Sequence, residues 1–131
     1  MPLVVEVAAG LIRDERGRYL VTQRRRGSHL PGLWEFPGGK LEAGEAPAAA
    51  LRRELTEELS AIFTVGKLVD TVRWEYPDRV VVLHFFDCRL ESGEIVPTES
   101  QAMTWVRPEE LGDYDFPPAD QELIRRLARR G

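Results

Sequence analysis

The segment GGKLEAGEAPAAALRRELTEELS, residues 38–60, joins two glycines to a strongly acidic helical pattern. Within it a leucine recurs every four residues, at Leu51, Leu55 and Leu59. This spacing predicts an α-helix over 47–59 that packs one face on a core. Pro47 suits the start of that helix, because proline is well tolerated at the first helical position.

The same helix carries a second stripe of side chains, roughly 100° around the axis from the leucines. This stripe consists of Glu54, Glu57 and Glu58. Like charges at this spacing destabilise a helix by roughly 0.2–0.5 kcal/mol per pair. Near the helix C-terminus, the macrodipole disfavours anions as well. A cation site explains both costs, because Mg²⁺ takes carboxylate oxygens together with water and substrate phosphates.

Outside this segment, apolar patterning predicts five strands, over 3–12, 18–25, 65–76, 79–90 and 104–107. A loop is expected over 26–47, a helical turn over 108–111 and a final helix over 117–130. Two helices and five or six strands in mixed order indicate the α/β (α+β) class, with a mixed β-sheet between helices. The length of 131 residues is that of one domain, covering 1–131.

The composition limits the partners that we expect. A net charge of −4 argues against a stable complex with nucleic acid, because such domains are usually strongly basic. Cys88 is the single cysteine, which excludes an intramolecular disulfide. Since no signal peptide is recognisable, we expect a cytoplasmic protein. No apolar run is long enough to span a membrane, and we expect a monomer.

The spacing of Gly39, Glu45 and RELTEE (residues 53–58) resembles the Nudix box. This box is the signature of hydrolases that act on nucleoside diphosphates linked to another group, so the resemblance implies the Nudix fold. Two positions depart from the pattern. Ala46 stands where many members have a capping threonine, and Ser60 stands where the last glycine is usual. A serine in the left-handed conformation costs about 1 kcal/mol relative to glycine.

The resemblance implies a role for each box residue. The metal ligands would be the three glutamates Glu54, Glu57 and Glu58. A backbone carbonyl at Gly38 would join them, and Arg53 would orient the site by pairing with Glu45. Glu99 stands where related enzymes carry a further loop glutamate that helps with metal or proton transfer. The implied cofactor is Mg²⁺, with Mn²⁺ as a substitute. The competing interpretation is a surface helix with solvated charges, and for Glu99 a plain loop acid.

Three further segments, LWEFPGGKLEAGE, EYPDR and DFPPAD, resemble the MutT subgroup. That subgroup hydrolyses 8-oxo-dGTP to the monophosphate and pyrophosphate, which removes a mutagenic nucleotide from the pool. The resemblance implies substrate contacts at Arg24, His29, Glu35, Phe36, Pro37, Gly38, Lys40, Arg79 and Asp120. Arg24 and His29 can also be read as an exposed strand edge and an uninvolved loop residue.

Asp120 is the position that bears most on the choice of base. MutT-type enzymes commonly have asparagine there, which accepts from N7–H of 8-oxoguanine and donates to O6. An ionised aspartate can only accept, whereas a protonated one can also donate. Asp120 could instead accept from the amine of cytosine, as in the CTP pyrophosphohydrolase branch, or merely stabilise the first turn of the last helix.

A rival of another class is a Nudix-fold module that binds nucleotides without catalysis. Such modules usually lose one or more of the box glutamates. All of the box glutamates are present here, which favours an enzyme.

Overall fold

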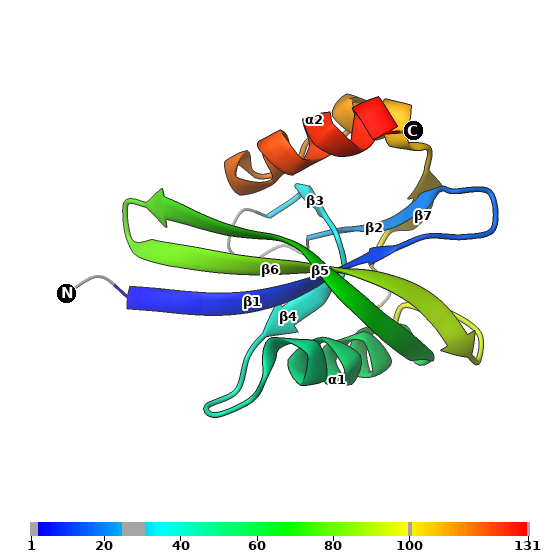
Figure 1. Cartoon of the computed structure of the whole chain (residues 1–131), viewed down its shortest axis with the longest axis horizontal. Coiled ribbons are helices and arrows are strands. Elements are labelled where there is room, and N and C mark those ends of the chain that lie inside the picture. The colour runs from blue at the N-terminus through cyan, green and yellow to red at the C-terminus, as the bar shows by residue number, and fades with distance from the viewer. Residues whose placement is uncertain (1–2, 25–30, 100, 131) are drawn as a thin grey trace.

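The computed structural model describes residues 3–24, 31–99 and 101–130. Two β-sheets lie between helix α1 (Pro47–Leu59) on one side and helix α2 (Gln121–Arg130) on the other (Figure 1). The predicted class, a mixed sheet between helices, is therefore confirmed.

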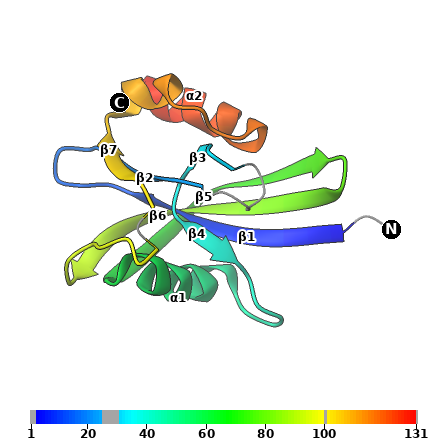
Figure 2. The same ribbon diagram turned by 180° about the vertical axis from the view of Figure 1, so that it is seen from behind.

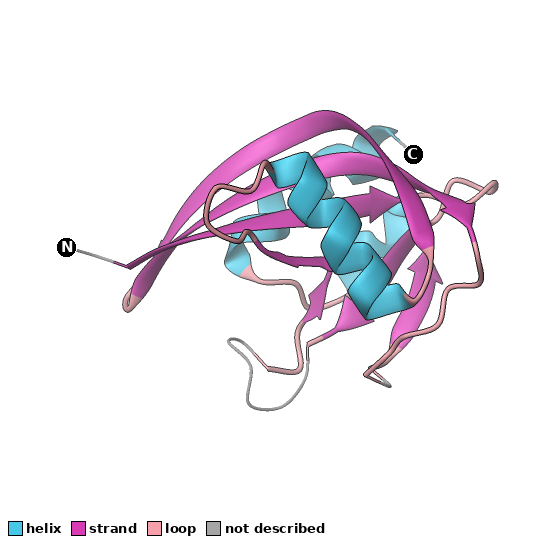
Figure 3. Cartoon of the chain, turned by 90° about the horizontal axis from the view of Figure 1, so that it is seen from below, coloured by secondary structure: helices cyan, strands magenta, loops and turns pink. Residues whose placement is uncertain are grey.

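The larger sheet has the strand order β4-β1-β6-β5. Its strands are β1 (Leu3–Ile12), β4 (Gly38–Lys40), β5 (Ile62–Tyr76) and β6 (Arg79–Ser92). β1 pairs in parallel with β6, whereas β4 and β5 pair in antiparallel fashion with their neighbours. The parallel pair places β1, at the start of the chain, beside β6, which follows much later in the sequence. Helix α1 lies across this sheet (Figure 3).

The smaller sheet has the order β3-β2-β7 and lies on the α2 side of the molecule (Figure 2). Its strands are β2 (Tyr19–Gln23), β3 (Trp34–Glu35) and β7 (Met103–Val106), all antiparallel. Two 3₁₀ turns, η1 (Pro108–Asp113) and η2 (Pro118–Asp120), lead from β7 into α2.

Several predicted bounds shift by two or three residues, as for β5, which begins at Ile62 and not at 65, and two regions differ in kind from the sequence prediction. The segment expected to be a loop over 26–47 contains β3 and β4, which at two and three residues are too short to show a periodic pattern. The last helix begins at Gln121, not at 117, because Pro117 is extended and Pro118 starts the separate turn η2. Asp120 therefore precedes the helix instead of lying in its first turn.

The predicted apolar faces of both helices are buried. On α1 they are Leu51, Leu55 and Leu59, and on α2 they are Leu123, Ile124 and Leu127. The α1 side packs around Phe63 and the α2 side around Phe85, so the sheets separate two apolar clusters. Within the described residues, neither helix has the length and apolarity that crossing a membrane requires.

Both unusual ends of α1 have the predicted form. Ala46 provides no side-chain cap, and Ser60 is left-handed with φ 59° and ψ 27°. The helix therefore depends on neighbouring segments to satisfy its terminal groups.

Candidate active site

The two glycines of β4 allow the chain to approach its neighbours more closely than any side chain would permit. A Cβ atom on Gly38 would lie 2.0 Å from the carbonyl oxygen of Ala8, and one on Gly39 would lie 2.3 Å from Oε2 of Glu54. These glycines let β4 pair with β1 while the helix carboxylates lie directly against its backbone.

Arg53 holds the loop and the helix together. Its Nε and Nη2 donate to the two carboxylate oxygens of Glu45, each at 2.9 Å, so the predicted pairing is present. These hydrogen bonds lower the pKa of Glu45 to about 2. Nη1 of Arg53 donates to Glu54 at 2.9 Å and to Glu57 at 3.3 Å. One guanidinium thus offsets part of the repulsion on the acidic stripe.

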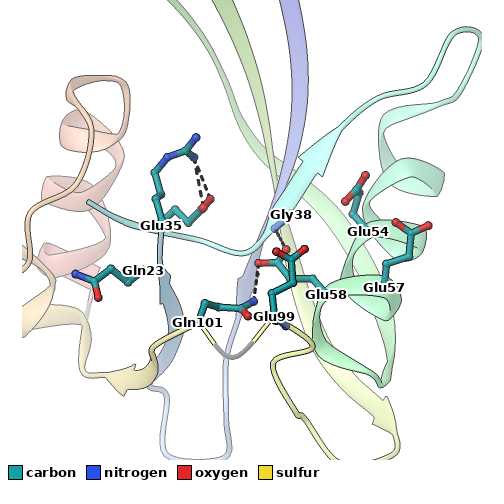
Figure 4. Close-up of a pocket in the computed structure, with 9 residues that line it drawn as sticks. Gln23, Glu35, Gly38, Glu54, Glu57, Glu58, Glu99 and Gln101 are labelled. Atoms are coloured by element: carbon teal, nitrogen blue, oxygen red, sulfur yellow. Dashed lines mark hydrogen bonds and ion pairs between the residues drawn. The ribbon is translucent and has the colours of Figure 1, made fainter. Parts of the chain in front are cut away.

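A cavity of about 250 Å³, here called the acidic cleft, lies beside the helix stripe. The lining residues are Gln23, Arg24, Glu35, Gly38, Glu54, Glu57, Glu58, Glu99 and Gln101 (Figure 4). The fold therefore brings the predicted loop residue Glu99 to the same cleft as the three helix glutamates.

Glu58 accepts hydrogen bonds at both of its carboxylate oxygens. The Gly38 N–H donates to its Oε2 at 3.3 Å, and the Gln101 amide donates to its Oε1 at 3.4 Å. Burial, and next the negative charge of Glu35, raise the pKa of Glu58 to about 7. A positive charge in the cleft would reverse that effect, because an opposite charge favours the ionised form.

The donor set of the cleft fits a hard cation, since such ions take carboxylate oxygens. In the conformations of the described residues, no three carboxylate, histidine or cysteine groups come close enough together to hold a metal ion. Arg53 forms ion pairs with Glu54 and Glu57, so at least one carboxylate oxygen of each is bound to its guanidinium. The metal-binding roles of these residues, and of the Gly38 carbonyl, stay predictions.

A second cavity of about 700 Å³, here called the base cavity, adjoins the first. Arg24, Glu35 and Gly38 line both cavities. Arg24 donates to the Glu35 carboxylate at 3.1 and 3.3 Å, which forms an ion pair in this shared wall. Burial raises the pKa of Glu35 despite that partner.

Asp120 lies at the base cavity and is only 5% exposed. Burial, and next the charge of Glu35, raise its pKa to about 7, while Arg24 acts in the opposite direction. Near neutral pH this carboxyl is therefore divided between a form that can donate a hydrogen bond and one that can only accept.

The other predicted substrate residues differ in how they are exposed to the base cavity. Lys40 and Arg79 line the base cavity, and Arg79 also donates to Asp78 at 3.0 Å. Phe36 lines the same cavity but is 3% exposed, because its ring packs on Phe85 and Phe116 in the core. Phe36 is therefore a core residue that also lines this cavity, and its role in flanking a base stays a prediction.

Pro37 does not line either cavity, and the prediction for His29 is not tested by the described residues. Pro37 is buried, and its carbonyl accepts from Gly10 at 2.8 Å. His29 lies outside the described residues.

Several lining residues were not predicted from the sequence. They include Gln23 and Gln101 in the cleft, and Val5, Val7, Tyr76, Val81 and Leu83 in the base cavity. The strand residues occupy alternate positions, so the pattern indicates a shared face but not a cavity. An uncharged glutamine in a loop gives no signal of its own.

Comparison with known proteins agrees with this geometry. Residues 8–126 match the NUDIX domain. The chain belongs to the Nudix family of hydrolases. Members of this family act on nucleotide substrates and generally use divalent cations, which fits the carboxylates of the cleft.

Individual relatives of this Nudix domain cover nearly its whole length. An 8-oxo-dGTP diphosphatase of Haemophilus influenzae is 40% identical over 124 residues, which is 95% of this chain and 91% of that protein. A CTP pyrophosphohydrolase of Escherichia coli is 40% identical over 121 residues, or 92% and 89% of the two chains. The crystal structure of a MutT protein from Methanosarcina mazei Go1 has a TM-score of 0.87 at 25% identity, covering 98% and 96%.

Proposed function

We propose that this Nudix hydrolase is a Mg²⁺-dependent nucleoside triphosphate pyrophosphohydrolase that converts 8-oxo-dGTP to 8-oxo-dGMP and pyrophosphate. The observation that carries this proposal is the shared wall of the two cavities. A nucleotide lying across Arg24, Glu35 and Gly38 would have its phosphates at the carboxylates and its base near Asp120. A relative of similar length is an 8-oxo-dGTP diphosphatase.

The acidic cleft supplies the groups that phosphate hydrolysis needs. Mg²⁺ held by Glu54, Glu57 and Glu58 would neutralise phosphate charge and lower the pKa of an attacking water. Glu99 or one of the helix glutamates would take the proton from that water. Attack at the β-phosphorus then releases the nucleoside monophosphate and leaves pyrophosphate as the other product.

The base cavity supplies the groups that can read an oxidised purine. In 8-oxoguanine, N7 carries a hydrogen, so a protonated Asp120 can accept from N7–H and donate to O6. The pKa of about 7 makes that neutral form available near neutral pH. Ordinary guanine has an acceptor at N7 and matches this carboxyl less well.

The experiment that tests the proposal compares kcat/KM for 8-oxo-dGTP, dGTP, CTP and 5-hydroxy-dCTP with purified protein and Mg²⁺. We expect 8-oxo-dGTP to exceed the others by about tenfold or more, since unpaired polar groups in a buried site are costly. Product analysis must show pyrophosphate and not orthophosphate. A higher kcat/KM for either cytidine nucleotide would overturn the choice of base.

A cytidine nucleotide is the second candidate, and the state of Asp120 is the observation that favours it. When ionised, Asp120 would accept a hydrogen bond from the exocyclic amine of cytosine. A CTP pyrophosphohydrolase is 40% identical to this chain. The same comparison of substrates distinguishes the two candidates.

A non-catalytic nucleotide-binding role is the remaining alternative. It is disfavoured because Glu54, Glu57 and Glu58 all line the acidic cleft and because the Arg53–Glu45 pair is present in the adjoining loop and helix. Nucleotide binding without pyrophosphate release in the presence of Mg²⁺ or Mn²⁺ would establish it. We expect the enzyme to be a cytoplasmic monomer, and light scattering after size exclusion measures the oligomeric state.

A further inference from the structure

The segment before β7 is fastened to the C-terminal end of α1. The Val96 N–H donates to the Leu59 carbonyl and the Thr98 N–H to the Glu58 carbonyl, each at 2.9 Å. The Thr98 hydroxyl lies 2.9 Å from the carbonyl of Glu57 and 3.1 Å from that of Glu58. The last carbonyls of a helix lack partners within it, so this segment serves as their cap.

Gln101 provides a second attachment with the two ends of its side-chain amide. Its nitrogen donates to Oε1 of Glu58 at 3.4 Å, and its oxygen accepts from the backbone N–H of Glu99 at 3.1 Å. The amide therefore joins the carboxylate of a helix residue to the backbone of a loop residue. Figure 4 shows Gln101 and Glu99 together beside Glu58.

These contacts lie on both sides of Glu99, whose carboxylate lines the acidic cleft. Glu99 and the helix glutamates come from different elements, separated in sequence by all of β5 and β6. Their relative position thus depends on how the segment is held against α1. Neither Thr98 nor Gln101 carries a charge, and neither has a role in the mechanism proposed above.

We propose that Thr98 and Gln101 are positioning residues that fix Glu99 relative to Glu58 across the acidic cleft. This inference rests on the proposed hydrolase function. Thr98 contacts the backbone carbonyls at the end of α1 and so holds the segment against the helix. Gln101 acts from the side-chain side, by orienting the Glu58 carboxylate that Gly38 also contacts.

The first test is kinetic and uses Thr98→Val, which replaces the hydroxyl by a methyl group and keeps the backbone N–H. We expect kcat to fall about tenfold while KM for the nucleotide changes less than about twofold, because small displacements of reacting groups are costly. Thr98→Ser keeps the hydroxyl and should stay within about threefold of wild type. Gln101→Leu should resemble Thr98→Val.

A matched control removes a hydroxyl elsewhere. Thr64 donates to Glu91 at 2.9 Å on the β5–β6 pair, and it does not line the acidic cleft. Thr64→Val should leave kcat and KM unchanged. An equal loss of kcat in Thr64→Val and Thr98→Val would overturn the inference, because removal of any hydroxyl would then suffice.

A double-mutant cycle tests whether Thr98 acts through Glu99. In a Glu99→Gln background, Thr98→Val should lower kcat by less than about twofold, since residues acting together are not additive. If Thr98→Val still lowered kcat tenfold in the Glu99→Gln background, the proposal that Thr98 positions Glu99 would be contradicted. Circular dichroism and thermal melting identify any variant that fails to fold, and Gln101→Leu serves as the deciding comparison if Thr98→Val is such a variant.

A readout independent of turnover is amide hydrogen exchange. In Gln101→Leu the Glu99 amide loses its acceptor, so it should exchange about tenfold faster or more, while the core amides of β6 are unchanged. Unchanged exchange at Glu99 would overturn the inference even if activity fell. If the wild type hydrolysed no nucleotide, the proposed function would fail, whereas the exchange result would still decide whether Gln101 holds Glu99.

Discussion

The acidic cleft and the base cavity share the wall of Arg24, Glu35 and Gly38, yet the chain builds them in different ways. Most carboxylates of the cleft come from one helical stripe, so a short local pattern specifies them. The base cavity is assembled from β1, β3, β4, β5, β6 and the turn before α2. The phosphate chemistry that we propose is therefore encoded locally in this protein, whereas the proposed recognition of the base depends on tertiary packing.

The largest expected effect belongs to the cleft. Glu58→Gln should lower kcat by about 10³-fold or more, because several kcal/mol of charge stabilisation in the transition state would be lost. The fold should persist, since glutamine is similar in shape and needs no charge compensation. Steady-state kinetics measure the loss of kcat, and circular dichroism shows whether the fold persists. Glu122→Gln on the exposed face of α2 is the control. Near-wild-type turnover in Glu58→Gln would remove this residue from the site.

The next effect belongs to the base cavity and concerns how the free energy of unfolding depends on pH. The pKa of Asp120 is about 7 in the folded protein, against an ordinary value of 3.8. The folded state holds this proton more tightly than the unfolded state, so the free energy of unfolding falls as pH rises from about 4 to about 7, and is level above that. Each pKa unit corresponds to about 1.36 kcal/mol, so the fall is at most about 4 kcal/mol.

Denaturant unfolding at several pH values tests that expectation. Asp120→Asn should lose this part of the pH dependence and keep the part that comes from Glu58, whose pKa is also about 7. Asp113→Asn, at an exposed acid, serves as the matched control. Identical pH profiles for wild type and Asp120→Asn would mean that Asp120 is not buried as described.

The third effect joins that titration to the choice of base. The neutral fraction of a carboxyl with pKa near 7 falls about tenfold between pH 6 and pH 8. The ionised fraction, which CTP would use, rises about tenfold over the same range, so the ratio of kcat/KM for 8-oxo-dGTP to that for CTP should fall by about a hundredfold. Titration of the phosphates cancels in the ratio. In Asp120→Asn the ratio should not change with pH, and a slope equal to that of wild type would contradict our assignment.

The fourth effect returns to the cleft. Mg²⁺ should relieve the repulsion among the carboxylates and raise the melting temperature by a few degrees, since ligand at about ten times Kd contributes roughly 1.4 kcal/mol. EDTA should reverse the rise. The shift should be smaller in Glu58→Gln, as differential scanning fluorimetry can show. An equal shift in that variant would indicate that Mg²⁺ binds elsewhere.

The smallest effect concerns the end of α1 that carries the cleft. Ser60 has φ 59°, a conformation that favours glycine. Ser60→Gly should stabilise the protein by about 1 kcal/mol, whereas Ser60→Ala should not, because alanine has the same steric cost. Denaturant unfolding measures both variants. No gain in Ser60→Gly would mean that the surrounding segment already compensates for the strain.

The sequence by itself determined the helix over 47–59, its buried leucines, its acidic stripe and the pairing of Arg53 with Glu45. The helix, its leucines and its stripe follow from spacing within a short segment, where the helical period fixes which side chains share a face. The pairing of Arg53 with Glu45, which precedes the helix, was implied by the resemblance to the Nudix box. The mixed sheet between helices was also predictable, because alternating runs and helical runs follow one another in recognisable order.

Only the tertiary structure decided the rest. β3 and β4 form because neighbouring strands supply their hydrogen bonds, and no periodicity within two or three residues can indicate that. The burial of Asp120 and the contacts of Gln101 arise where distant elements meet, at the base cavity and at the end of α1. Burial and the charges of neighbours set the pKa of a carboxyl, and both are properties of packing that a residue type alone does not contain.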